Sequence, residues 1–418
     1  MDYNHLFLYS VVIRWVGSIA AFTIGLYLAK NHWNRLGLKC FLAYYCLRIA
    51  LLWAFCMVGG AYPMDLPEWH SISRWMVDEH LFPGIGFHTG YFLGFNGILA
   101  LSSWLWNSPF AIAIPWTLCE MSAMGLFFIS LRKLYDETTA KRSIILYLLS
   151  PVCLFCSWLG AQDEPLYLLF AGLFLYSLTR DTKAHHLFFL GFLSIFFTKM
   201  VIPLFLLPFF LIKRWRGAIL FASAGIAYLL LALALGTNPF DMQFCRMGQE
   251  SASSYLTMDT QPGCLWYFTS GLPKIAQSVM LVAALGASGI FFLPKFLGKT
   301  QLSIRQGLET GILLHGSWIL VLTLLFRYNF AAYLVPFAFF IAFQMAASLS
   351  ARTWSFYETT AATWMSMIVI KDFLMVLVKR QLISSTTCDI LSLLCLAANV
   401  VMALAFILRF RFSPNSYK

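Results

Sequence analysis

The chain has 418 residues, of which 60% are hydrophobic, 17% aromatic and 11% charged, and its formal net charge is +11. A mean hydropathy of +0.75, with apolar stretches recurring along the whole sequence, excludes a soluble globular protein. Basic and aromatic residues are not interleaved on one soluble face, so the positive charge does not indicate a nucleic-acid-binding protein.

The apolar stretches predict an all-α polytopic membrane protein with a single transmembrane domain over residues 1–418. They are continuous rather than alternating, which favours helices over a β-barrel. The first begins at Leu6 and is long enough to span, so we expect a membrane helix there and no cleaved signal peptide. A span needs about 20 apolar residues, and we predict about 13 spans, with a range of about 11 to 13. They lie at residues 7–29, 40–61, 110–131, 143–159, 165–179, 186–197, 200–212, 217–235, 273–293, 307–326, 330–348, 359–378 and 387–408.

Basic residues predict the orientation of these helices. If the loop at 30–39 is cytoplasmic and the spans alternate, most of the 29 Lys and Arg residues fall on the cytoplasmic side, as the positive-inside rule requires. The alternation holds only if residues 88–106 do not cross the membrane. We therefore predict that residues 62–108 form an external loop with interfacial helices. The alternative is that 88–106 is an ordinary span.

The same orientation gathers acidic residues on the non-cytoplasmic face. Two external loops, 62–108 and 237–272, and short turns at Gln162, Lys199 and Arg327 lie on that side. They hold half of the 18 acidic residues of the chain, namely Asp65, Glu68, Asp78, Glu79, Asp163, Glu164, Asp241, Glu250 and Asp259. A protein with its polar residues on this face is expected to act there.

Charged residues also occur within the apolar stretches, where they are costly and often functional. They are Arg14, Arg48, Glu120, Lys371 and Asp372. Arg14, near the outer end of its stretch, and Lys371 can snorkel to the membrane surface. Arg48 and Glu120 are instead candidates for pairing across two helices.

The external loops hold residue types that bind metals or form disulfides. In the first loop, a divalent cation could in principle be bound by Asp78, Glu79, His80 and His88. Their spacing matches neither HExxH nor DxD, so we assign no metal ligand and no certain cofactor. In the second loop, the sequence leaves open whether Cys245 and Cys264 form a disulfide.

Four segments between residues 40 and 345 share an order of features with one family. A span leads into Asp65 and the run Leu66–His70. A helix containing Ser150-Pro151 emerges at Gln162-Asp163-Glu164. Lys199 stands between Phe197 and Pro203, and Arg327-Tyr328-Asn329 enters a span with Tyr333 and Pro336. This pattern resembles the membrane glycosyltransferases of the GT-C fold, which include GPI mannosyltransferases and bacterial enzymes that use polyprenyl-phosphate sugars.

The resemblance implies transfer of a monosaccharide, such as mannose, from a polyprenyl-phosphate donor to a glycan, lipid or protein acceptor. Asp65 would be the base that takes the proton of the acceptor hydroxyl. Lys199 and Arg327 would stabilise the negative charge of the donor phosphate. The other expected substrate-binding residues are Gln162, Asp163, Glu164, Tyr328 and His70.

Each of these roles has a simpler alternative. Asp65 can be a solvated carboxylate at a helix end, and Asp163 and Glu164 can cap the helix that begins at Pro165. Lys199 and Arg327 can contact the headgroups of bulk lipid. The chain also departs from the family pattern, because an additional span precedes the one that ends at Asp65 and because Gln-Asp-Glu replaces a spaced acidic pair.

Other functions remain open from the sequence. A transporter or flippase of a lipid-linked glycan would need charges along a central cavity, and a membrane acyltransferase would need a histidine such as His315; a glycan polymerase is a further alternative. We expect location in a bacterial inner membrane, with the endoplasmic reticulum as the alternative. The sugar, the acceptor, the stereochemistry and the oligomeric state are not determined by the sequence.

Overall fold

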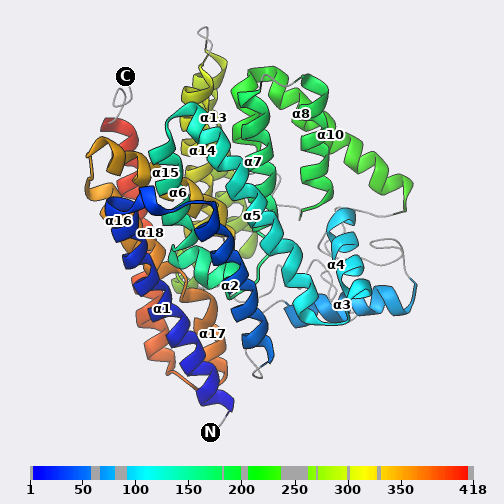
Figure 1. The fold of residues 1–418 in the computed structure, drawn as a ribbon, viewed down its shortest axis with the longest axis vertical. Helices are drawn as coiled ribbons and strands as arrows, with labels where there is room; N and C mark the ends of the chain where they lie inside the picture. The colour runs from blue at the N-terminus through cyan, green and yellow to red at the C-terminus, as the bar shows by residue number, and fades with distance from the viewer. Residues whose placement is uncertain are drawn as a thin grey trace.

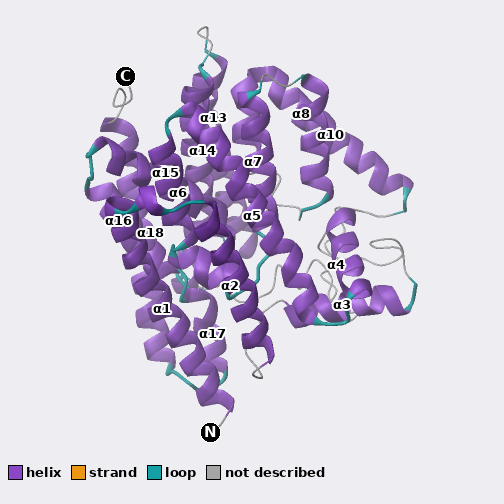
Figure 2. Cartoon of the chain, viewed as in Figure 1, coloured by secondary structure: helices purple, strands orange, loops and turns teal. Residues whose placement is uncertain are grey.

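The computed structural model describes residues 3–57, 66–80, 92–180, 183–198, 206–236, 262–269, 272–298, 302–326 and 331–412. Every regular element in these residues is a helix, so the all-α prediction is confirmed (Figure 2). Several residues singled out by the sequence lie outside the described residues: Asp65, His88, Lys199, Cys245, Arg327 and Tyr328.

Eight helical segments among the described residues are long and apolar enough to cross a membrane, which makes the protein a polytopic membrane protein. They are Leu6–Asn31, Pro109–Leu134, Leu207–Ala234, Ile275–Leu297, Ile304–Leu325, Ala331–Ala351, Phe356–Lys379 and Ser385–Arg409. Three further apolar helices are shorter: Leu93–Leu105, Pro165–Thr179 and Ala184–Phe196. The predicted number of 13 spans is not confirmed by this set.

The N-terminal half contains α1 (Tyr3–Asn31), η1 (Trp33–Arg35), α2 (Leu38–Met57), α3 (Leu66–Asp78), α4 (Leu93–Leu105), α5 (Pro109–Leu134), α6 (Glu137–Leu148), the π-helix η2 (Cys153–Trp158), α7 (Pro165–Thr179) and α8 (Ala184–Phe196). The C-terminal half contains α9 (Leu207–Phe210), η4 (Leu211–Lys213), α10 (Arg214–Ala234), α12 (Leu265–Phe268), α13 (Lys274–Leu297), α14 (Ile304–Leu325), η5 (Ala331–Leu334), α15 (Val335–Ala351), α16 (Phe356–Ile368), α17 (Lys371–Lys379) and α18 (Ser385–Phe412).

The core lies around α15, which packs on α6 and stands near α5 and α7 (Figure 1). In the segment that contains α15, 78% of the most apolar stretch is buried, whereas in α13 only 11% is buried. The difference arises because α15 is apolar on every side and is surrounded by helices. Phe127 of α5 stacks on Phe339 of α15 with ring centroids 3.9 Å apart. Helix α13 therefore lies at the periphery, and α15 at the centre.

The helix ends predicted to be cytoplasmic lie together at one end of the bundle. Hydrogen bonds join the loops at these ends, which carry many of the Lys and Arg residues. The hydrogen bonds that join them run from Arg142 to Ala29 and Ser350, from Lys133 to Thr179, from Tyr135 to Glu309, and from Arg214 to Gly298. This is the end at the top of Figure 1, opposite the N-terminus. The sidedness that we assign to this end stays a prediction.

Two predicted spans are short or interrupted within the described residues. The described part of 200–212 forms only α9 and η4, which lead into α10 at Arg214, where φ is 60°. A separate span at 200–212 stays a prediction, because residues 200–205 lie outside the described residues. The span at 359–378 is divided into α16 and α17, because three successive β-branched residues at 368–370 weaken the helix and Asp372 favours a new helix N-terminus.

The first predicted external loop contains two short helices. Helices α3 and α4 have 13 residues each, about 20 Å of helix by the usual rise per residue, which is shorter than a membrane core of about 30 Å. Helix α3 runs across the direction of the long helices in Figure 1. The described part of 88–106 is therefore shorter than a full straight span, and the external position of residues 62–108 stays a prediction.

Candidate functional site

The best-defined part of the candidate site is the turn that carries Gln162, Asp163 and Glu164, called here the acidic turn. It follows the π-helix η2, in which Leu159 N–H donates to the Leu154 carbonyl at 2.9 Å. Gln162 N–H then reaches back to the Cys156 carbonyl at 3.3 Å, and Ala161 has a φ of 46°. The wide π turn and the left-handed residue reverse the chain within a few residues.

Both carboxylates of the acidic turn are buried, with 2% of Asp163 and 1% of Glu164 exposed. Their main-chain carbonyls accept the N–H groups of Leu166 and Tyr167, so the backbone of the turn begins α7. Glu164 is the N-cap residue, yet its side chain makes no capping hydrogen bond. Capping of α7 by the side chain therefore does not account for a glutamate at position 164. A buried carboxylate in a membrane segment is instead a candidate for function.

Two other segments lie beside the π-helix that precedes the acidic turn. The π-helix η2 contacts η5, which begins at Ala331, just after the predicted donor-binding residues Arg327 and Tyr328. Both carboxylate oxygens of Asp372 accept the Ala331 N–H, at 2.8 and 2.9 Å. The second and fourth segments of the family pattern are thus adjacent, although more than a hundred residues separate them in the sequence.

Lys371 and Asp372 are the residues that sequence reasoning did not include in the site. They start α17 at the break in the helix, and only 1% of Lys371 is exposed. Cys156 interacts electrostatically with Glu164, Asp372 and Lys371, which places both acids near one thiol of the π-helix. The sequence did contain a signal for them, because Lys371 and Asp372 are adjacent charged residues in the middle of an apolar stretch.

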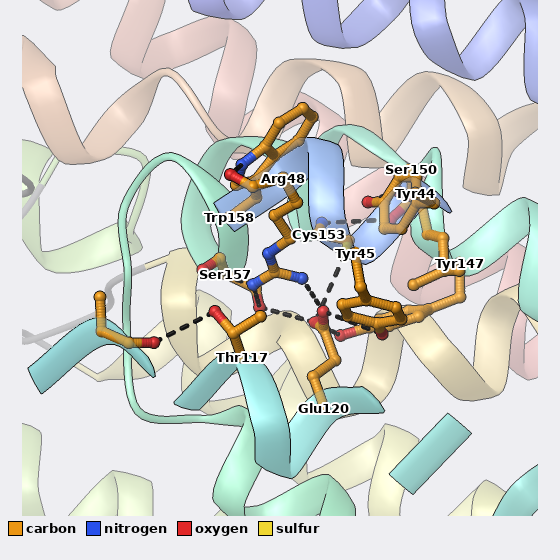
Figure 3. Close-up of polar contacts among 12 residues, drawn as sticks. Tyr44, Tyr45, Arg48, Thr117, Glu120, Tyr147, Ser150, Cys153, Ser157 and Trp158 are labelled. Carbon is orange, nitrogen blue, oxygen red and sulfur yellow. Dashed lines mark hydrogen bonds and ion pairs between the residues drawn. The ribbon is translucent and has the colours of Figure 1, made fainter. Parts of the chain in front are cut away.

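A buried polar network, called here the Glu120 network, lies beside the π-helix (Figure 3). Glu120 of α5 forms an ion pair with Arg48 of α2, with 0% and 1% of the side chains exposed. Its other oxygen accepts the hydroxyls of Tyr147 at 2.7 Å and Ser157 at 2.6 Å. The sequence marked each of these two charges as a candidate for pairing across helices, and the structure pairs them with each other.

The residues that precede Lys199 lie against the start of α4, which packs on α3. Thr198, which precedes Lys199, accepts the N–H of Phe92 through its carbonyl at 3.3 Å. A Cβ added to Gly94 would lie 2.4 Å from the ring of Phe196, so α4 packs tightly on the end of α8. The chain just before Lys199 is therefore held against the start of α4.

His70 lies on α3 and is half-buried. One of its ring nitrogens is 3.0 Å from Asn107 Oδ1. Partial burial lowers the pKa of His70, the charge of Arg74 lowers it further, and the hydrogen bond to Asn107 opposes this shift. The hydrogen-bond partner that we find for His70 is therefore in the loop before α5, and its role in substrate binding stays a prediction.

Three other candidates can be placed. Asp78 forms an ion pair with Arg74, and within the described residues no group of three or more His, Cys, Asp and Glu residues could hold a metal ion. Cys264 is a buried free thiol, whereas Cys245 lies outside the described residues. His315 is fully buried, with Tyr167 Oη 3.3 Å from its Nδ1, which does not favour its use as an accessible acyltransferase base.

Comparisons with known proteins give one similarity of overall structure. No family model and no curated protein matches the chain. The crystal structure of ArnT from Cupriavidus metallidurans in the apo state is similar over 87% of this chain and 75% of that chain, with 13% sequence identity and a TM-score of 0.39.

Proposed function

We propose that this protein is a GT-C-type membrane glycosyltransferase that uses a polyprenyl-phosphate-linked monosaccharide on the non-cytoplasmic face of the membrane. The observation that supports this proposal is the buried acidic turn, which follows a π-helix that contacts η5. In the sequence, η5 directly follows the basic and aromatic residues expected at the donor phosphate. Acids and cations from distant segments would then face one donor, and the acceptor would be a glycan, lipid or protein.

The proposed reaction is a displacement at the anomeric carbon of the donor sugar. The acceptor oxygen forms a bond to this carbon as the bond to the phosphate oxygen breaks, and Asp65 takes the hydroxyl proton. The polyprenyl phosphate leaves with an additional negative charge, which Lys199 and Arg327 stabilise. A single carboxylate base suits inversion of the anomeric centre.

The acidic turn would bind the sugar or the acceptor through hydrogen bonds. A carboxylate accepts hydrogen bonds from hydroxyl groups, and such bonds are stronger in buried surroundings than in water. Asp163 and Glu164 thus serve as binding residues, with Gln162 at the edge of the turn. Gln162 is half-buried and donates from Nε2 to the Gly160 carbonyl at 3.3 Å.

The test is Asp65→Asn and Asp65→Ala in proteoliposomes that contain undecaprenyl-phosphate hexoses, with mannose as the first sugar. Loss of a general base lowers the rate by roughly 100-fold to 10,000-fold, and we expect this loss in both variants. Glu79→Gln is the matched control, because Glu79 is an exposed acid of the same predicted loop. Full transfer by Asp65→Asn would exclude the base assignment, and movement of unaltered donor across the membrane would favour a flippase.

A further inference from the structure

The Glu120 network connects α2 directly to the π-helix that carries the acidic turn. We propose that Arg48 and Glu120 are positioning residues, which hold the acidic turn in register with α2, the helix that precedes Asp65 in the sequence. They touch no substrate and act through η2. The inference rests on the proposed function for its catalytic consequence, but the structural part can be tested without it.

The connection between α2 and η2 runs in both directions. Arg48 Nη2 donates to the carbonyl and to the hydroxyl of Ser157, at 3.1 and 3.2 Å. Trp158 Nε1 donates back to the Arg48 carbonyl at 3.1 Å. A π-helix shifts the regular main-chain bonding pattern, and here an arginine from another helix bonds a carbonyl near its end. The last turn of η2 is therefore fixed relative to α2.

Glu120 fixes the orientation of Arg48. Its carboxylate accepts from Arg48, Tyr147 and Ser157, and the hydroxyl of Tyr45 lies 3.4 Å from Oε2. The four elements α2, α5, α6 and η2 thus share one buried carboxylate. Replacing a buried ion pair with apolar residues is often neutral for stability, so the value of this pair lies in the geometry that it imposes.

The acidic turn needs such support because its backbone is strained. Ala161 has a left-handed conformation that non-glycine residues adopt only at a cost, and surrounding contacts must maintain it. The residues between Ser157 and Asp163 form the short path from the network to the acidic turn. A shift of Ser157 would therefore move Asp163 and Glu164 together.

A second buried ion pair provides a matched control. Glu358 at the start of α16 pairs with Arg409 of α18 and accepts the Ser348 hydroxyl at 2.6 Å. Like Glu120 it is 0% exposed, but it joins α16 and α18 near the end of α15. Loss of this carboxylate removes a comparable ion pair without touching η2.

The experiment compares Glu120→Gln, the double variant Arg48→Met with Glu120→Gln, and Glu358→Gln. The amide that Glu120→Gln introduces can still accept from Tyr147 and Ser157, but in the single variant Arg48 is left as a buried charge, so this variant can be unstable. The double variant removes that charge together with the bonds from Arg48 to Ser157. We expect the double variant to be more stable to heat than Glu120→Gln. We also expect the acidic turn to be no longer held in place relative to α2.

Two measurements decide the outcome. Hydrogen exchange of backbone amides 153–164 should accelerate in the double variant and stay at the parent rate in Glu358→Gln. Transfer from undecaprenyl-phosphate mannose, or from the hexose donor that the parent uses, should show a kcat lower by about 100-fold, with a smaller change in KM, because misplacement of about 1 Å can cost that much.

A double variant with parent exchange rates and parent kcat would overturn the inference and leave the network a purely structural ion pair. If the parent transfers no sugar, the proposed function fails, and the exchange measurement alone still decides whether the network positions the turn. Parent exchange rates in that case would overturn the inference as well.

Discussion

At the scale of single residues, the buried carboxylates fall into two kinds of surroundings. Glu120 and Glu358 each face an arginine and serine hydroxyls, which compensates the cost of burying their charge. Asp163 and Glu164 instead lie in a turn that opens a helix, close to the segment of Lys371 and Asp372. The first kind holds helices together, and the second is where we expect the substrate to bind.

His70 should make the stability of α3 depend on pH. Its pKa is lowered in the folded state from the usual value of 6.5, so folding favours the neutral ring. The contribution of the neutral His70 ring to the stability of the folded protein is therefore complete above pH 6.5. It is lost as the pH falls through the lower folded-state pKa of His70. We expect thermal unfolding in detergent to show a lower midpoint at pH 5.5 than at pH 7.5, with a smaller difference in His70→Gln. An equal pH dependence in both proteins would contradict this assignment.

At the scale of elements, the candidate site lies where helices are interrupted. The π-helix η2 precedes the acidic turn, and the break between α16 and α17 places Lys371 and Asp372 beside the same region. Interrupted helices in membrane proteins expose main-chain groups that need partners, and they occur where the backbone is buried in protein. Asp372 supplies such a partner to Ala331.

The close packing of the turn can be tested at Gly160. A Cβ at this position would lie 2.3 Å from the Cys156 carbonyl oxygen, a main-chain atom that cannot rotate away. Overpacking of this kind costs about 1–3 kcal/mol, so Gly160→Ala should lower the thermal midpoint and the transfer rate. Gly125→Ala in α5 is the control, because no atom lies within 4 Å of its added Cβ. Equal thermal midpoints and transfer rates in the two variants would show that the turn tolerates an added methyl group at Gly160.

The sequence predicts elements well where their cause is local. Continuous apolar stretches predicted the long helices, and Pro165 correctly indicated the start of α7. The partner of Arg48 could not be predicted, because 72 residues separate it from Glu120 and the pairing depends on how α2 packs on α5. The π-helix and the split of 359–378 have no periodic signature, since hydrophobic burial does not distinguish a continuous apolar helix from an interrupted one.

At the scale of the whole molecule, the described basic loops that join the helices gather at one end of the bundle. The basic loops meet at one end, as the distribution of Lys and Arg predicted, whereas the residues between α17 and α18 lie at the other end, where Arg380 is 4.3 Å from the ring centroid of Phe7 in α1. The positions of the predicted catalytic base and phosphate-binding cations could not be compared, because they lie outside the described residues.

The orientation can be checked with short epitopes in two loops. An epitope at 32–36 should react with antibody only in inverted vesicles, and one at 381–384 only in right-side-out vesicles. The two loops lie at opposite ends of the bundle in the structure, so both epitopes on one side would contradict the fold. The reverse assignment would keep the fold and contradict the orientation.

Helix α18 has a consequence for how the protein is made. It packs on α14, α16 and α17, and Asn399 joins Trp364 at 2.7 Å to the carbonyl of Gly263 at 3.0 Å. Cys395 of the same helix covers Gly263 and interacts electrostatically with Lys371. Lys371 is synthesised before α18, so until α18 inserts, this cation lacks the helix that encloses it in the folded protein.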